Sequence, residues 1–270
     1  MELIKGDSME EILKQVLFDN YNLIVKQIVK NEESTDGNVY IIETVDKKFV
    51  VKIYKNKKHT DSMIRLHKHL FNNDFYVPKI IKNHNNKNYV ELKNNIVVVY
   101  SFLDGQQLSN LELYSKDIIK KLAKELKRFH DITNNNIYEL NEISNNLENL
   151  KRKSALHFDL TKHNIFYNNG KIGFIDFDDA KFGPSVYDVA ITSALLFFSK
   201  KRGLDENNLE LFIESYYENN KNLKEKEFPL IKKIAINWVN YILDNNEFDS
   251  SLKESFNIKK ELLESSNYLL

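Results

Sequence analysis

The residues best suited to chemistry gather in one stretch, HFDLTKHNIFYNNGKIGFIDFDDA, at positions 157–180. It contains four Asp, two His and three Asn, one of which is part of the turn dipeptide Asn169-Gly170. Both residues of this dipeptide tolerate the positive φ values of a type I′ turn, and apolar-rich segments flank it. The stretch therefore predicts a tight β-hairpin with polar side chains at its open end.

Three of these polar side chains are expected to lie together at the open end of the hairpin. Counting outward from a two-residue turn places Asn164 opposite Ile175, next to Asp176, and a register error of one residue would not separate them. Asp159 lies five residues before Asn164, in a loop that enters the same end. Amide and carboxylate oxygens suit Mg²⁺, which takes few protein ligands and leaves positions for substrate phosphates. A single Asp near a turn is ordinarily a solvated turn former, and Asp178 and Asp179 match that description.

The elements that must position these residues change in character along the chain. Short β-branched or aromatic runs separated by polar turns dominate the first hundred residues, with a helix expected at about 60–71. From Ser115 onward the apolar residues recur with a helical period. A short helix that opens with the capping-box spacing of Ser8 and Glu11 precedes the strands. The expected strands are residues 25–29, 38–44, 48–54, 76–81, 88–92 and 95–102.

These patterns predict an α+β fold with two lobes. Residues 1–102 are expected to form an antiparallel β-sheet lobe with one helix, and residues 103–270 a mainly α-helical lobe. A cleft between two such lobes is a common place for a ligand. Tyr216, Tyr217, Trp238 and Tyr241 recur at a spacing that suits the core of the helical lobe.

The composition narrows the class of protein. With 42% hydrophobic and 12% aromatic residues, the 270-residue chain can bury a core, which excludes global disorder. Lys plus Arg equals Asp plus Glu at 39 each, so no overall charge favours nucleic acid or a membrane. The absence of Cys excludes disulfides and thiolate chemistry and is compatible with a reducing compartment. No secretory signal is visible, and the longest apolar stretch, residues 189–198, is too short to span a membrane. We expect a cytoplasmic protein and leave its oligomeric state open.

Several landmarks resemble one known family. The pattern H-x-D-x-x-x-x-N at 157–164, followed by I-D-F-D at 175–178, is similar to the catalytic and metal loops of protein-kinase-like phosphotransferases. The small-molecule branch, of the aminoglycoside phosphotransferase and choline kinase type, is the better match. The run DFDDAKFGPSVYD leaves no room for the long activation segment of protein kinases. The other landmarks follow in the family's order: STDGNVY (34–40), VVKIY (50–54), VVYSFLDGQQL (98–108) and LAKELKRFH (122–130).

The resemblance implies a bilobal protein-kinase-like fold and a role for each site residue. It implies transfer of the γ-phosphate of ATP or GTP to a hydroxyl of an aminoglycoside, amino alcohol or related metabolite. Asp159 would orient that hydroxyl and take its proton, while Asn164 and Asp176 would hold Mg²⁺. Such roles suit a loose transition state, for which positioning and charge neutralisation are the main needs. The implied nucleotide-binding residues are Lys52 for the phosphates, Ser34, Gly37 and Asn38 over them, and the backbone of Ser101 and Phe102 for the purine.

The sequence also departs from the family. Phe158 occupies a position in the catalytic loop where the family commonly has Gly, and His157 is expected to brace this loop. Asp188 is expected to cap its helix or to brace the same loop. The helix expected after Lys52 contains no Glu to pair with it, and Asp61 is the candidate acid there. The loop at 34–40 lacks multiple glycines.

Two alternatives remain beside the small-molecule kinase. One is a compact protein Ser/Thr kinase, against which the short activation region counts. The other is a nucleotide-binding pseudokinase without turnover. The missing Glu favours this alternative, whereas the presence of Asp159, Asn164 and Asp176 argues against it. The acceptor is not decided by the acidic residues of the C-terminal helices, because nearby lysines balance them.

Overall fold

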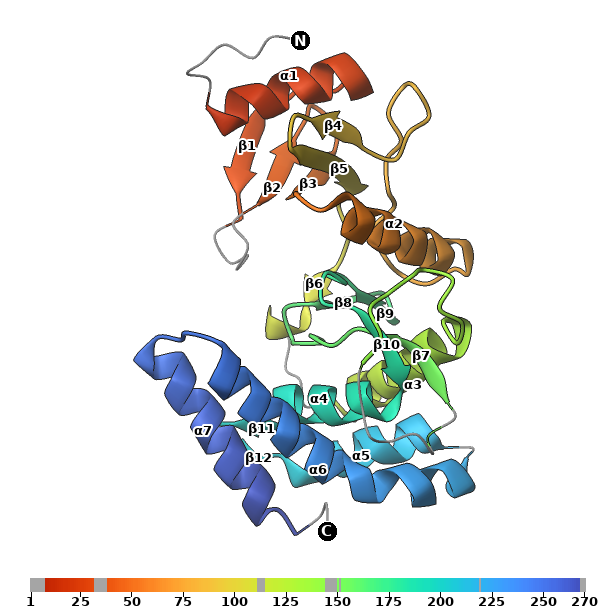
Figure 1. Cartoon of the computed structure of the whole chain (residues 1–270), viewed down its shortest axis with the longest axis vertical. Coiled ribbons are helices and arrows are strands. Elements are labelled where there is room, and N and C mark those ends of the chain that lie inside the picture. The colour runs from red at the N-terminus through yellow and green to blue at the C-terminus, as the bar shows by residue number, and fades with distance from the viewer. Residues whose placement is uncertain are drawn as a thin grey trace. The chain divides into compact units, whose positions relative to one another are not determined.

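The computed structural model describes residues 8–31, 38–110, 115–143, 150, 152–218 and 220–267. Ser34 and Gly37, two of the predicted nucleotide-binding residues, lie outside this part of the chain. The chain divides into two compact units, Met1–Asp104 and Gly105–Leu270 (Figure 1). Among the described residues, no helix combines the length and the apolar character needed to cross a membrane.

The N-terminal unit is built on one antiparallel sheet with the strand order β1-β2-β3-β5-β4. In β3, Lys52 lies opposite Val39 of β2 and opposite Val98 of β5. The strands are β1 (Gln27–Lys30), β2 (Val39–Glu43), β3 (Lys48–Tyr54), β4 (Val90–Leu92) and β5 (Asn95–Ser101).

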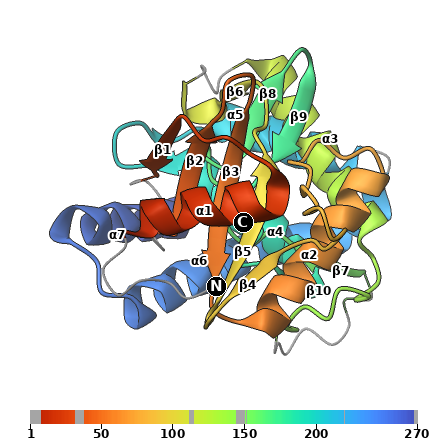
Figure 2. The same cartoon turned by 90° about the horizontal axis from the view of Figure 1, so that it is seen from above.

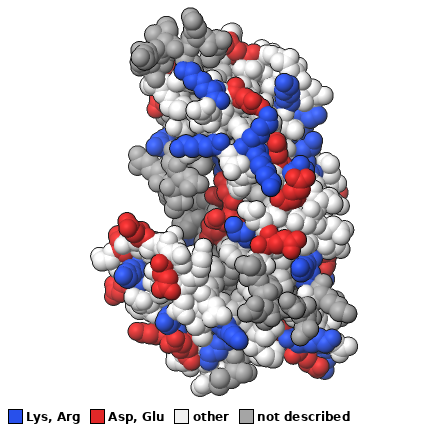
Figure 3. Space-filling view, in the orientation of Figure 1, with Lys and Arg blue, Asp and Glu red and all other residues white. Residues whose placement is uncertain are grey.

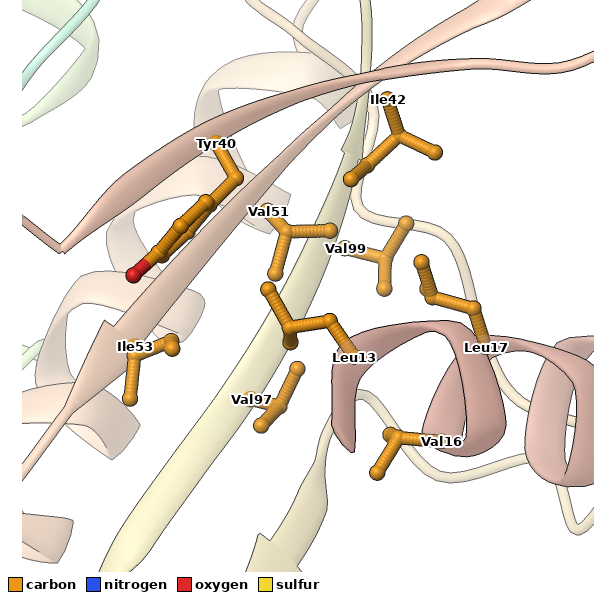
Figure 4. Packing of buried hydrophobic residues seen from close by; sticks show 9 residues of the cluster. All are labelled: Leu13, Val16, Leu17, Tyr40, Ile42, Val51, Ile53, Val97 and Val99. Carbon is orange, nitrogen blue, oxygen red and sulfur yellow. The ribbon is translucent and has the colours of Figure 1, made fainter. Parts of the chain in front are cut away.

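Each face of this sheet carries its own hydrophobic cluster. Helix α1 (Met9–Tyr21) lies across one face, as Figure 2 shows, and its Leu13 and Leu17 pack with Val51 and Ile53 of β3 (Figure 4). The opposite cluster contains Ile64 of α2 (Lys57–Asn72) together with strand residues. Because side chains alternate along a strand, Lys52 emerges on the face that α2 covers.

The two helices described in this unit, α1 and α2, correspond to the short helix predicted before the strands and to the helix predicted at about 60–71. One detail of the unit differs from the sequence-based expectation. The predicted strand at 76–81 is wrong, because the segment forms only isolated bridges, at Tyr76 and at Ile80, the second of them to Tyr100 of β5. Pro78 in the middle of that segment has no N–H to donate to a ladder, which opposes regular pairing. The capping box of α1 is confirmed: the Ser8 N–H donates to Glu11 Oε2 and the Glu11 N–H to Ser8 Oγ, at 3.0 and 3.3 Å.

The C-terminal unit is mainly helical, as predicted. Helix α3 packs against α5, α4 against α6, and α6 against α7. Tyr216, Tyr217 and Trp238 are buried in this unit, but Tyr241 is 60% exposed, so its predicted place in the core is wrong. The helices are α3 (Lys116–Ile132), α4 (Val186–Phe197), α5 (Glu206–Tyr217), α6 (Lys221–Asn245), α7 (Ser250–Ser265) and the 3₁₀ helix η1 (Leu108–Asn110).

Short strands connect these helices and carry the predicted loops. Strand β7 pairs with β10, β11 with β12, and β8 lies between β6 and β9. The strands are β6 (Gln106–Gln107), β7 (Lys153–Leu156), β8 (Ile165–Asn168), β9 (Lys171–Phe174), β10 (Lys181–Pro184), β11 (Phe198–Ser199) and β12 (Gly203–Leu204). On the face drawn in Figure 3, acidic and basic side chains are interspersed, in keeping with the balanced composition.

Candidate active site

The predicted hairpin is present with the predicted turn and register. Asn168 pairs with Lys171, and the turn residues Asn169 and Gly170 have φ values of 47° and 87°. The pairing continues outward until the Ile175 N–H donates to the carbonyl oxygen of Asn164, at 3.0 Å. The register therefore places Asn164 beside the residue that precedes Asp176, as the turn chemistry required.

A compact turn brings Asp159 and Asn164 into direct contact. The Asn164 side-chain nitrogen donates to the backbone oxygen of Asp159 at 2.8 Å and to its Oδ2 at 3.0 Å. The Thr161 N–H also donates to the Asp159 oxygen, and the Asn164 N–H donates to the Thr161 oxygen. Since Nδ2 of Asn164 donates to Asp159, Oδ1 of Asn164 is the side-chain atom that could bind a cation or accept a hydrogen bond.

The Asp159 carboxyl group has a strongly shifted proton affinity. Burial, together with the negative charges of Asp179 and Asp176, raises the pKa of Asp159 to about 7, although the Asn164 hydrogen bond acts in the opposite direction. A carboxylate with a pKa near neutrality is suited to accept a proton at neutral pH. The contribution of Asp179 was not foreseen, because its position next to a turn is typical of an ordinary solvated turn residue.

Asp176 lies at the end of the hairpin in an unusual backbone conformation. Its φ is 65°, in the left-handed region, and its charge acts on Asp159. The local chemistry suits a divalent cation: it offers oxygen ligands, and the accumulated negative charge is visible in the raised pKa of Asp159. Among the described residues, no group of three or more His, Asp or Glu is arranged to hold a metal. A site formed by Asn164 and Asp176 would therefore take its remaining ligands from phosphates and water, as Mg²⁺ commonly does.

The backbone of the catalytic loop is held by one buried carboxylate. The His157 and Phe158 N–H groups donate to Oδ2 and Oδ1 of Asp188, at 2.6 and 2.8 Å. Phe158, which replaces the family's Gly, has a φ of 70°, a conformation that costs a residue with a side chain roughly 1–2 kcal/mol. Asp188 was predicted either to cap its helix or to brace the loop, and these hydrogen bonds confirm that it braces the loop. Asp188 lies in the first turn of α4, whose N-cap is Ser185.

Two buried histidines connect this loop to its surroundings. His157 contacts the carbonyl oxygen of Ile175 through Nε2 at 2.9 Å, and its ring lies 4.7 Å from that of Phe177. His130 of α3 contacts Asp188 Oδ2 through Nε2 at 3.1 Å. Burial lowers the pKa of both histidines. The predicted bracing role of His157 is confirmed, whereas the role of His130 was not foreseen, although it ends the matched segment LAKELKRFH.

The N-terminal unit holds the described nucleotide-binding candidates on its sheet. Lys52 lies in the middle of β3, and Asn38 directly precedes β2, where its carbonyl oxygen accepts the Ile53 N–H at 3.0 Å. Helix α2 contains a single acidic residue, Asp61. The roles of Lys52 and Asn38 stay predictions.

The structure narrows the predicted purine contacts at the end of β5. The Ser101 N–H donates to the Lys79 oxygen at 2.8 Å, and the Phe102 N–H donates to the Lys48 oxygen at 3.3 Å. These two residues therefore have their carbonyl oxygens left for a base. Within the described part of the chain, no group accepts the N–H of Leu103, which sequence reasoning had not considered. A purine edge carries both donors and acceptors, so a carbonyl from Ser101 or Phe102 and the Leu103 N–H form a complementary set.

Comparison with known proteins defines the class of this chain. The model of the phosphotransferase enzyme family matches residues 27–139 and 137–218. This match covers well over half of the chain, and the chain therefore belongs to the phosphotransferase enzyme family. The predicted family and enzyme class, a small-molecule phosphotransferase, are confirmed. No curated protein sequence matches the chain.

Solved structures confirm the protein-kinase-like fold. A spectinomycin phosphotransferase in complex with ADP and spectinomycin is 15% identical with a TM-score of 0.68, covering 94% of this chain and 96% of that one. An amicoumacin kinase solved with AMP-PNP and Ca²⁺ is 14% identical with a TM-score of 0.73, covering 97% and 95%. A choline kinase from Streptococcus pneumoniae is 14% identical with a TM-score of 0.63, covering 96% and 99%. The nucleotides and the divalent ion in the first two agree with the predicted ATP and divalent metal.

Proposed function

We propose that this chain transfers the γ-phosphate of ATP to a hydroxyl group of a small, cationic amino-sugar or amino alcohol, with Asp159 as the base. The single observation that carries the assignment is Asp159 itself. Its carboxylate is partly buried near two other carboxylates, contacts Asn164, and has a pKa of about 7. Membership in the phosphotransferase family supports the reaction class.

Asp159 would act on the acceptor in two ways. Its carboxylate oxygen would accept a hydrogen bond from the acceptor hydroxyl and hold that oxygen in line with the phosphorus. As the new O–P bond forms, the same carboxylate would take the hydroxyl proton. Asn164 would fix the carboxylate through the 3.0 Å contact with Oδ2.

Asn164 and Asp176 would hold the divalent cation through Oδ1 and a carboxylate oxygen. Bound there, Mg²⁺ would neutralise charge on the nucleotide phosphates. Lys52 would bind the phosphates as a cation on a regular strand, with Ser34, Gly37 and Asn38 near them. The purine would hydrogen-bond to the backbone of Ser101 or Phe102 and Leu103.

The acceptor class rests on the proteins of similar fold. Their names include kinases of spectinomycin, choline, ethanolamine and aminopropanol, all of which carry an amino or quaternary ammonium group beside a hydroxyl. An acceptor of that kind suits a base surrounded by other carboxylates, because Asp159, Asp176 and Asp179 create a negative potential.

The proposal is tested by ADP and GDP release with Mg²⁺ and each nucleotide across a panel of aminoglycosides, choline, ethanolamine, aminopropanol and a generic protein. We expect acceptor-dependent release with one of the amino alcohols or aminoglycosides. Asp159→Asn should lower kcat by about 10²–10⁴-fold, the usual contribution of a general base. Asp205→Asn provides a matched control, because Asp205 is the N-cap of α5 and Asn is an equally good cap.

Other outcomes would redirect the assignment. Release stimulated only by the generic protein would support the protein-kinase alternative. Tight nucleotide binding with no release for any acceptor would favour the pseudokinase alternative. Equal activity of Asp159→Asn and Asp205→Asn would contradict the role given to Asp159.

A further inference from the structure

A line of hydrogen bonds connects a half-exposed arginine with the buried carboxylate beneath the catalytic loop. Arg152 Nη1 lies 3.2 Å from Tyr216 Oη, and Tyr216 Oη lies 2.6 Å from His130 Nδ1. On the other side of its ring, His130 Nε2 contacts Asp188 Oδ2. Tyr216 belongs to α5, a helix that takes no part in the proposed active site.

The donor-to-acceptor direction of these hydrogen bonds follows from the chemistry of Arg152. A guanidinium group can only donate, so Arg152 donates to Tyr216 Oη. The single hydrogen of the tyrosine hydroxyl is then free to point at His130 Nδ1, which must accept it. His130 consequently carries its proton on Nε2 and donates to Asp188, which as a carboxylate only accepts. Every donor in the line points towards Asp188.

A cationic His130 does not suit this arrangement. With both ring nitrogens protonated, Tyr216 Oη would accept two hydrogen bonds and its own hydrogen would have no partner. Burial is the largest influence on His130 and lowers its pKa, against the opposing effects of Asp188 and Asp131 and with the help of Arg152. The neutral ring with the Nε2 proton satisfies every polar atom in the line.

We propose that Tyr216, oriented by Arg152, is a positioning residue that fixes the His130 ring and, through Asp188, the backbone of the catalytic loop. Asp188 receives three hydrogen bonds, from the His157 and Phe158 amides and from His130. Releasing the His130 ring would leave Asp188 with less support and loosen the two amides that precede Asp159. The functional meaning of this inference rests on the proposed function of Asp159.

The adjacent residue provides a matched control. Tyr217 is also buried, at 3% exposure, and its hydroxyl donates to a buried carboxylate, Glu227 Oε2, at 2.7 Å. Tyr216→Phe and Tyr217→Phe therefore remove the same atom from neighbouring positions on the same helix. Only the first of them breaks the line to Asp188.

The experiment combines two measurements that need no turnover. In uniformly ¹⁵N-labelled wild-type protein, imidazole ¹⁵N spectra should show His130 as the neutral tautomer protonated on Nε2. A ring protonated on Nδ1 would overturn the direction of the line. Native-state hydrogen exchange of the His157 and Phe158 amides should be roughly five- to tenfold faster in Tyr216→Phe than in wild type, the effect expected for one lost buried hydrogen bond. Tyr217→Phe should leave these amides near the wild-type rate, and equal exchange in the two variants would overturn the positioning role.

A kinetic measurement then connects the line to catalysis. Tyr216→Phe should lower kcat by roughly tenfold with little change in the KM for nucleotide, because a misplaced base weakens the transition state and not the nucleotide complex. Equal kcat values for Tyr216→Phe and Tyr217→Phe would overturn the positioning role. If wild type releases no ADP with any acceptor, the proposed function fails, and the tautomer and exchange results still decide the structural part of the inference.

Discussion

The loop around Asp159 in the C-terminal unit and the strands around Lys52 in the N-terminal unit are stabilised by different interactions. In the loop, the residues around Asp159 are held by hydrogen bonds to buried polar groups, and Phe158 and Asp176 adopt positive φ values. In the sheet, Lys52 lies in a regular ladder between two apolar clusters. The loop is therefore expected to be sensitive to the loss of single polar atoms, whereas the sheet is expected to be sensitive mainly to register and packing.

The sharpest test of this comparison is Asp188→Ala. The change leaves the buried His157 and Phe158 amides and the His130 Nε2–H without their acceptor, so we expect a loss of about 3–5 kcal/mol in the free energy of unfolding. Urea denaturation followed by circular dichroism measures it. Asp205→Ala, which removes an N-cap carboxylate, should cost only about 1 kcal/mol. Similar losses in the two variants would show that the loop does not depend on its buried carboxylate.

The sheet is tested by Lys52→Met. Loss of a charged hydrogen bond to phosphate is expected to raise the KM for ATP by about 10- to 100-fold with little loss of stability. Lys48→Met is the control, because Lys48 lies on the same strand but forms an exposed ion pair with Glu43. Steady-state kinetics give the KM for ATP of both variants. An unchanged KM for Lys52→Met would show that Lys52 does not bind the nucleotide.

The raised pKa of Asp159 makes a prediction about stability. Its pKa is about 7 in the folded protein, against an ordinary value of 3.8, so the folded state favours the protonated acid. The stability that this preference contributes is complete below about pH 4 and is lost as the pH rises through 7. Asp159→Asn should therefore be more stable than wild type at pH 8, by a difference of the order of 4 kcal/mol that disappears towards pH 4. Thermal melts across this range measure it, and a difference independent of pH would contradict the raised pKa.

The smallest effect concerns the backbone of Phe158. Phe158→Gly and Phe158→Ala both remove the ring, but only Ala keeps a Cβ at a φ of 70°. We expect the Gly variant to be more stable than the Ala variant by about 1 kcal/mol. Equal stabilities would mean that the loop relaxes out of the left-handed conformation when the ring is lost.

Local chemistry explains which parts of the fold could be predicted from the sequence. The turn at Asn169-Gly170 fixed the hairpin register, and the capping box fixed the start of α1, because both signals act within a few residues. The segment 76–81 was wrongly predicted as a strand because its apolar residues outweighed Pro78 in the pattern. The burial of Tyr241 was also wrongly predicted, since helical spacing does not say where a helix end leaves the core.

The candidate site shows the same limit. Asp159, Asn164 and Asp176 could be grouped because a hairpin places them within a short stretch of chain. The line of hydrogen bonds from Arg152 through Tyr216 and His130 to Asp188 could not be found, because each bond joins residues 58 or more positions apart. The effect of Asp179 on Asp159 depends on burial, which the sequence pattern does not report.

The role of Asp159 as the base is tested by the pH dependence of acceptor-dependent ADP release by wild type and Asp159→Asn. If Asp159 is the base, its deprotonated form is active, so kcat/KM of wild type should rise about tenfold per pH unit at low pH and level off near pH 7. The residual activity of Asp159→Asn should lack this inflection. An inflection near pH 7 that persists in Asp159→Asn would show that another group takes the proton and that Asp159 is not the base.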